Sequence, residues 1–304
     1  RMKANKMTVY NSRFQYIDYN LQTPKMLDFT QLNGKIEDFF IKGPNVYTFI
    51  DKLSFKDHRG LLVENITADF TYTKKNILLE QLAMKTSLSE MKGRVELKYN
   101  RKDFSDFNNK VIFDVQFDKA TIASNDLNYF YNEFGKNNVF YVDTHLIGTL
   151  NNFTTHNLKL VDKNQSEIVG TANFRNLFGK GNQEFYMKGN FDRITSNYED
   201  LKSILPRILG NNLPSVLAKL GNVNISGAVE LTQKYINADV SMLSQLGYLE
   251  GNLAMQNINN IDNASYKGNI KLDAFDLGTL LSQNDIGKVT LDLDVDGKVS
   301  TQKL

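Results

Sequence analysis

The stretch KVTLDLDVDG, residues 288–297, decides how the rest of this sequence is interpreted. Two sets of residues alternate along it: Val289, Leu291, Leu293 and Val295, and Thr290, Asp292, Asp294 and Asp296. Successive side chains of a β-strand point to opposite faces, so this segment has one apolar face and one polar face. Such alternation is typical of an antiparallel sheet with one buried and one solvated face, not of a parallel sheet covered on both sides.

The same alternation recurs along the chain. It is present in RVELKY (94–99), VIFDVQFD (111–118), EFYMKGNF (184–191) and GNIKLDAF (268–275). Asn33-Gly34, Lys92-Gly93 and the run 108–110 are predicted as turns between strands. We therefore expect a mostly β protein: an elongated, antiparallel sheet curled into an open, taco-like groove, with short amphipathic helices inserted at intervals of about 75 residues.

A repeated phrase predicts those helices. The pattern Asp-Leu-x-x-apolar-apolar begins at Asp126, Asp200 and Asp276, and its leucines are 74 and 76 residues apart. The i, i+3, i+4 spacing predicts one apolar helix face in each copy. The residues expected to contact the sheet are Leu127, Phe130, Leu201, Ile204, Leu205, Leu277, Leu280 and Leu281. The simpler explanation is that the helices cover the apolar face or plug its end; the alternative is a moving gate.

The repeat also suggests a domain organisation. Residues 1–110 are expected to form strands only, and residues 111–304 repeated strand–helix–strand units at about 111–183, 184–265 and 266–304, the last incomplete. Ser196-x-x-Glu199 is a candidate capping box for the second helix. Because strand-like patterns run into both ends of the sequence, we expect a segment of a longer protein.

Composition excludes several classes of protein. The 304 residues are 41% hydrophobic and 23% charged, with a net charge of +2, which is typical of a folded chain and gives no basic patch for nucleic acid. There is no cysteine, so disulfides, thiolate metal sites and cysteine catalysis are excluded. No window approaches the roughly 20 apolar residues of a membrane-spanning helix.

Motifs for catalysis or metal binding are weak. The run 292–297, DLDVDG, matches the first half of an EF-hand loop, but the twelfth position is Lys303, where a bidentate Glu is needed. His58, His145 and His156 have no metal-ligand spacing, and Gly179-Lys180-Gly181 is better explained by a turn than by a dinucleotide fingerprint. The prediction is therefore a protein that is not an enzyme and has no metal or cofactor.

Several runs resemble the TamB-like branch of the AsmA-like, bridge-like lipid transfer family. They are DYNLQTPKMLDFTQLNGKIEDF (18–39), RKDFSDFNNKVIFDVQF (101–117), DLNYFYNEFG (126–135), HLIGTLNNFTTHNLKL (145–160) and FDLGTLLSQNDIGKVTLDLDVDG (275–297). The likeness extends over essentially the whole chain, but it is one of texture and short phrases. No single motif in it is specific.

The resemblance implies a role in outer-membrane biogenesis, chiefly the passive transfer of phospholipid across the periplasm of a Gram-negative cell. It implies an inner-membrane anchor and an outer-membrane β-barrel partner of the TamA/Omp85 type, both reached through regions outside this segment. No nucleic-acid partner is expected.

The residues expected to line a lipid-binding groove are those of the apolar strand faces. They are Val111, Phe113, Val115, Phe117, Phe185, Met187, Ile270, Leu272, Val289, Leu291, Leu293 and Val295. Each of them is explained equally well by ordinary core packing. Two further hypotheses therefore stay open: a structural or scaffolding β-repeat protein with a closed, dry core, and an enzyme with a compact polar pocket.

Overall fold

The computed structural model of the chain describes residues 1–18, 25–131, 134–178, 184–204, 206, 213, 215–258 and 263–298. Its strands follow one another in chain order, from β1 to β16, in an antiparallel sheet that does not close. The fold is thus mostly β with a few short helices, as the alternation predicted. The chain divides into two compact units, which are described separately below.

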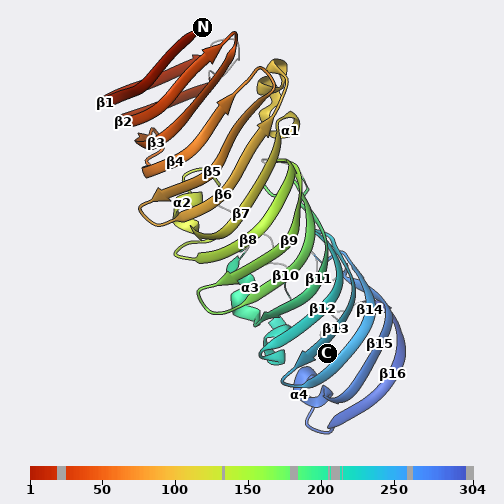
Figure 1. Cartoon of the computed structure of the whole chain (residues 1–304). Helices are drawn as coiled ribbons and strands as arrows, with labels where there is room; N and C mark the ends of the chain where they lie inside the picture. The colour runs from red at the N-terminus through yellow and green to blue at the C-terminus, as the bar shows by residue number, and fades with distance from the viewer. Residues whose placement is uncertain are drawn as a thin grey trace. The chain divides into compact units, whose positions relative to one another are not determined.

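The first unit comprises Arg1–Asn132 and Val139–Phe153. Its strands are β1 (Met2–Asp18), β2 (Lys25–Lys42), β3 (Asn45–Asp57), β4 (Leu62–Tyr72), β5 (Asn76–Thr86), β6 (Glu90–Lys98), β7 (Ile112–Ala123) and β8 (Val139–Thr149). Its helices are the 3-10 helix η1 (Arg101–Asp106), α1 (Phe107–Lys110) and α2 (Ser124–Leu127). The strands lie side by side in Figure 1, with α1 and α2 at opposite ends of them.

The second unit comprises Glu133–Asn138 and Thr154–Leu304. Its strands are β9 (Asn152–Asp162, whose first two residues belong to the first unit), β10 (Glu167–Arg175), β11 (Tyr186–Ser196), β12 (Val223–Thr232), β13 (Tyr235–Ser244), β14 (Gly247–Gln256), β15 (Ser265–Asp276) and β16 (Lys288–Lys298). Its helices are α3 (Tyr198–Ile204), the 3-10 helix η2 (Ser215–Leu220) and α4 (Leu277–Leu281).

The Asp-Leu helices occur at regular places in this strand order. The helices α2, α3 and α4 follow β7, β11 and β15, and their first residues are 74 and 79 residues apart, 124 to 198 to 277. In a chain of antiparallel neighbours, every connection from an odd to an even strand lies at the same end of the strands. Within the second unit, α3, η2 and α4 therefore share one end of the sheet (Figure 1).

Some local predictions were wrong. Asn33-Gly34 and Lys92-Gly93 are not turns but lie inside β2 and β6, and residues 108–110 belong to α1 rather than to a turn. Gly93 has a φ of +150°, and a Cβ placed on it would lie 1.9 Å from the carbonyl oxygen of Gln116 on β7. This glycine therefore allows close approach of a neighbouring strand rather than a change of direction. Residues 1–110, expected to contain strands only, also include η1 and α1.

The cap of α3 is one residue later than predicted. The side-chain oxygen of Asn197 accepts from the backbone N–H of Asp200 at 3.0 Å, and the Asn197 amide donates to the Asp200 carboxylate at 2.7 Å. Ser196 ends β11, and its hydroxyl bonds instead with that of Ser166 at 2.9 Å. Asn and Ser are equally good N-cap residues, so the sequence alone did not distinguish the two positions.

Candidate functional site

Strand register in the second unit places apolar residues in four rows that cross β10 to β16. Each row consists of residues that are paired from one strand to the next, and we call the four rows together the apolar face. The rows are Phe174–Met187–Leu231–Ile236–Met255–Tyr266–Gly297, Ala172–Gly189–Val229–Ala238–Leu253–Gly268–Val295, Gly170–Phe191–Gly227–Val240–Gly251–Ile270–Leu293 and Ile168–Ile194–Ile225–Met242–Leu249–Leu272–Leu291. Every position in these rows lacks a charged side chain.

The opposite face of the same strands is polar. One of its rows is Thr171–Asn190–Ala228–Asp239–Asn252–Asn269–Asp294. Polar contacts link its strands: Lys267 forms an ion pair with Asp296 at 3.0 Å, and the Asn269 amide donates to Asp292 at 2.9 Å. Because such exposed ion pairs contribute little stability, this face mainly keeps one side of the sheet in water.

The two central rows alternate small and large side chains from strand to strand. The small residues on β11 to β15 are Gly189, Gly227, Ala238, Gly251 and Gly268, and the large residues beside them on the same strands are Phe191, Val229, Val240, Leu253 and Ile270. A Cβ on Gly268 would lie 1.9 Å from the backbone oxygen of Asn252, and one on Gly227 2.2 Å from that of Asp239. Gly227, Gly251 and Gly268 are therefore required by close backbone approach, and a Cβ on Gly189 would instead meet the Phe191 ring.

Only one end of the apolar face is covered by helices in the described part of the chain. Leu217 and Leu220 of η2 and Leu277 and Leu280 of α4 pack with the row that contains Met242 and Leu272. The buried centre of this cluster is Leu220, Val223, Met242, Leu246, Leu272 and Phe275. Farther along the strands the face is partly exposed, and Tyr266 and Leu293 each keep 37% of their surface accessible.

Carboxylates hold α2 and α3 to the hairpin turns beside them. Asp126 of α2 is 7% exposed and accepts hydrogen bonds from the hydroxyls of Thr86 at 2.5 Å and Ser89 at 2.6 Å, both at the β5–β6 turn. In the second unit, Asp200 of α3 accepts from the Asn164 amide at 2.6 Å and the Ser166 hydroxyl at 3.2 Å, at the β9–β10 turn. Hydrogen bonds to charged groups are among the stronger ones in proteins.

The first unit has a comparable division into two faces. One row of its apolar side is Phe70–Leu79–Val95–Val115–Leu146, across β4 to β8. On the polar side, Lys98 Nζ lies 2.7 Å from Asp114 and His145 Nε2 lies 2.8 Å from the same carboxylate. The hydrogen bond from Lys98, followed by that from His145, holds the pKa of Asp114 below its ordinary value. For Glu96, burial acts to raise the pKa, but hydrogen bonds from Arg94 and Asn76 outweigh it and the pKa is lowered.

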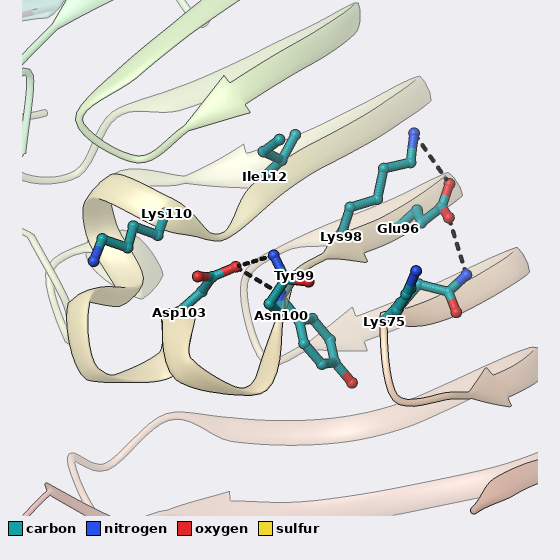
Figure 2. Close-up of a pocket in the computed structure, with 9 residues that line it drawn as sticks. Lys75, Glu96, Lys98, Tyr99, Asn100, Asp103, Lys110 and Ile112 are labelled. Atoms are coloured by element: carbon teal, nitrogen blue, oxygen red, sulfur yellow. Dashed lines mark hydrogen bonds and ion pairs between the residues drawn. The ribbon is translucent and has the colours of Figure 1, made fainter.

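A polar pocket of about 560 Å³ lies on this polar side (Figure 2). It is lined by Lys75, Asn76, Glu96, Lys98, Tyr99, Asn100, Asp103, Lys110 and Ile112. Glu96 and Lys98 pair with each other at 3.5 Å, and Asp103 accepts from the Asn100 backbone at 2.6 Å. Figure 2 shows the amine of Lys110 directed away from the other lining groups. The pairing of Glu96 with Lys98 and the bond from Asn100 to Asp103 favour a structural role over a binding site.

The structure places the predicted groove residues as follows. Met187, Ile270, Leu272, Leu291, Leu293 and Val295 lie on the apolar face of the second unit, and Val289 pairs with Phe275 beside it. Phe113, Val115 and Phe117 lie together on β7 of the first unit. Val111 and Phe185 precede β7 and β11 and are 0% and 3% exposed, so they are core residues at the strand ends.

The residues predicted to connect the helices to the sheet differ in burial and in position. Leu277 and Leu280 pack on the buried cluster, and Ile204 of α3 is buried. Leu281 is 51% exposed, and Phe130 lies outside α2, with the Arg59 guanidinium 4.1 Å above its ring. Leu127 and Leu201 are half-buried in α2 and α3. Leu205 falls outside the described residues.

Sequence reasoning missed the contribution of β12, β13 and β14 to the apolar face. Their lining residues are Ile225, Val229, Leu231, Ile236, Val240, Met242, Leu249, Leu253 and Met255. Alternation is visible in 224–231. Gly227 in that run, and Ala238 and Gly251 on the next two strands, interrupt the apolar positions and weaken the signal. When glycine and alanine are counted together with the apolar residues, the period of two continues along β12, β13 and β14.

No group of three or more acidic or histidine side chains that could hold a metal ion is found among the described residues. The helices in that part of the chain are all too short or too polar to cross a bilayer. In comparisons with known proteins, no family model, no curated protein and no solved structure matches this chain.

Proposed function

We propose that the apolar face binds the acyl chains of phospholipids, and that the protein shields them from water during transfer between membranes. The observation that supports this proposal is the continuity of the four apolar rows across seven paired strands, β10 to β16, without a charged residue. An apolar surface of this extent, with helices over one end in the described residues, is typical of an interaction site.

The dimensions and energetics agree with an acyl chain as ligand. Six strand spacings of about 4.8 Å give each row a length of about 29 Å. One layer of acyl chains occupies about half of the roughly 30 Å hydrocarbon core of a bilayer, so each row is long enough for one extended chain. Moving a chain of about 16 carbons into water costs on the order of 13 kcal/mol, at about 0.8 kcal/mol per CH₂. Contact with the apolar face would offset much of this cost while a headgroup stays in water.

The resemblance to the TamB-like branch supplies the cellular setting of this proposal. A periplasmic location, an inner-membrane anchor and a partner barrel in the outer membrane remain predictions from that resemblance. The proposal for the apolar face does not depend on them.

A structural or scaffolding role is the second candidate. The alternation of small and large residues in the two central rows favours it, because such alternation also allows inward side chains of a sheet to fill their own interior. In this case the apolar face would be a closed, dry core and would hold no lipid.

Lipid extraction from the purified protein distinguishes the two. The protein is purified, extracted with organic solvent and analysed by mass spectrometry, in parallel with Leu293→Asp and Asn252→Asp. Leu293 is partly exposed on the apolar face, and Asn252 lies on the polar face of β14. Both substitutions add one negative charge. A difference between the two variants therefore reports the face that carries the charge, not the charge itself.

We expect phospholipid with the native protein and with Asn252→Asp, and its loss from Leu293→Asp while circular dichroism shows an intact sheet. The cost of placing a carboxylate against hydrocarbon is the physical reason. Repeated absence of lipid from the native protein, after exposure to phospholipid vesicles, would contradict the proposal and favour the scaffold.

A further inference from the structure

The α4 loop, residues 277–286, differs from the other Asp-Leu helices in how it is held. Asp276 does not bind a neighbouring hairpin: its carboxylate accepts from the backbone N–H and the hydroxyl of Thr279, within the same loop, at 2.9 and 2.8 Å. Asp126 and Asp200, at the equivalent places in α2 and α3, bind side chains of separate turns.

The loop is closed by its own hydrogen bonds. The N–H of Gln283 donates to the oxygen of Gly278 at 2.9 Å, and the N–H of Ile286 donates to the oxygen of Gln283 at 3.2 Å. A Cβ on Gly278 would lie 1.7 Å from the oxygen of Ile286, so the two ends of the loop are packed against each other. A segment bonded in this way can move as one body without breaking its internal structure.

Its side-chain hydrogen bonds to other elements come from Lys219 of η2. The Lys219 ammonium donates to the oxygens of Thr279 at 3.1 Å and Leu280 at 2.9 Å, and to the Ser282 hydroxyl. The two carbonyls lie at the C-terminal end of α4, where a cation is favoured. Leu277 and Leu280 also attach the loop, and both are only partly buried on the cluster.

The two ends of the loop can act as hinges. At the first, the Asp276 N–H is fixed to the Leu246 oxygen at 2.7 Å, next to the fully buried Phe275. At the second, Gly287 has no atom within 4 Å of a built Cβ, and all residues from 281 to 288 are exposed. Hinges are commonly a few such positions that absorb a backbone change.

We propose that the α4 loop is a lid over one end of the apolar face, and that Lys219 is its latch. Opening removes Leu277 and Leu280 from the row that contains Leu272 and Leu291 and admits an acyl chain there. This inference rests on the proposed function, because it assigns the entry point to the same lipid site. By contrast, α2 and α3 are held to neighbouring hairpin turns by Asp126 and Asp200 and do not open.

Thiol labelling measures the opening. The chain has no cysteine, so Leu280→Cys introduces a single thiol on the side of the lid that packs against the cluster. In that background, Lys219→Gln should raise the maleimide labelling rate about tenfold, because it removes hydrogen bonds from a charged donor. Ile204→Cys, buried at α3, is the matched background in which Lys219→Gln should leave the rate unchanged. No increase at Leu280→Cys, or the same increase in both backgrounds, would overturn the latch.

Cross-linking relates the opening to lipid. Lys219→Cys with Ser282→Cys, bridged by a bismaleimide, replaces the latch by a covalent one, and the same double variant without the bridge is the control. We expect the bridged protein to take up a fluorescent phosphatidylethanolamine from vesicles severalfold more slowly than the control. Equal uptake would overturn the lid and leave the proposed function standing. If neither these proteins nor the native protein takes up lipid, the proposed function itself fails, and the lid with it.

Discussion

At the scale of single residues, glycines inside strands show why residue type alone is a poor guide to turns. Gly93 and Gly268 both have positive φ and both lie in the middle of strands, where the carbonyl oxygen of the next strand occupies the space of a side chain. The sequence predicted a turn at Gly93 because glycine usually marks a change of direction. Only the neighbouring strand, which is distant in sequence, shows the other use of the residue.

Gly268→Ala tests this close approach. The new Cβ would meet the Asn252 oxygen at 1.9 Å, and φ is +158°, so strand β15 must move away from β14. We expect a loss of unfolding free energy of about 3 kcal/mol or more, measured by urea denaturation. Gly287→Ala, which meets nothing within 4 Å, is the control and should change stability by less than about 0.5 kcal/mol. Equal effects of the two substitutions would contradict the assignment.

The Asp114 carboxylate gives a pH-dependent prediction. Its pKa is lowered in the folded protein by Lys98 and then by His145, so its stabilising effect is complete above the ordinary Asp pKa of about 3.9. That contribution is lost as the pH falls through the lower pKa of the folded state. Asp114→Asn should therefore cost about 1 kcal/mol of unfolding free energy at pH 7, and the difference from the native protein should shrink below about pH 4.

Urea denaturation at a series of pH values measures this difference. Lys98→Met removes the first of the two partners and should shift the acid limb of the stability curve upward in pH. A cost of Asp114→Asn that is the same at pH 7 and at pH 3 would show that the carboxylate acts by packing, not by charge.

At the scale of elements, each copy of the Asp-Leu phrase coincides with a short helix, although α2 ends at Leu127, and the phrase did not show how the helices are held. The leucines follow a local period, which a sequence shows directly. The partners of Asp126 are Thr86 and Ser89, 40 and 37 residues away, and no local pattern links them. The contrast between a docked α2 and a self-capped α4 is therefore visible only after the hairpins are assembled.

Asp126→Asn tests the docking of α2. The substitution replaces a charged acceptor of two hydroxyls by an amide, in a position that is 7% exposed. We expect a loss of about 2 kcal/mol in unfolding free energy and faster hydrogen exchange at the amides of Asn128 and Tyr131, which bond back to α2. Asp118→Asn, with one exposed contact to Gln116, should stay within about 0.5 kcal/mol of the native protein. Similar losses in both variants would argue against a specific anchor.

At the scale of the whole molecule, the antiparallel β fold followed from alternation alone. In segments such as 288–297 each strand shows its two faces without reference to its neighbours. The extent of the apolar face did not follow, because it depends on register. Gly251 and Ile270 become neighbours in one row only when β14 and β15 pair. Whether that face holds lipid or its own side chains is a property of the assembled sheet, and thermal stability distinguishes the two.

A ligand that binds only the folded sheet must stabilise it by mass action, by about 2.7 kcal/mol at a free concentration 100 times Kd. For a chain of this size, that corresponds to a rise in Tm of about 5 °C. We expect such a rise when the native protein or Asn252→Asp is heated with saturating short-chain phosphatidylglycerol, and a much smaller one for Leu293→Asp. If the core is closed and dry, the folded protein offers the ligand no binding surface, and only the unfolded chain exposes apolar residues to it. In that case the added lipid would leave the Tm unchanged or lower it in all three proteins.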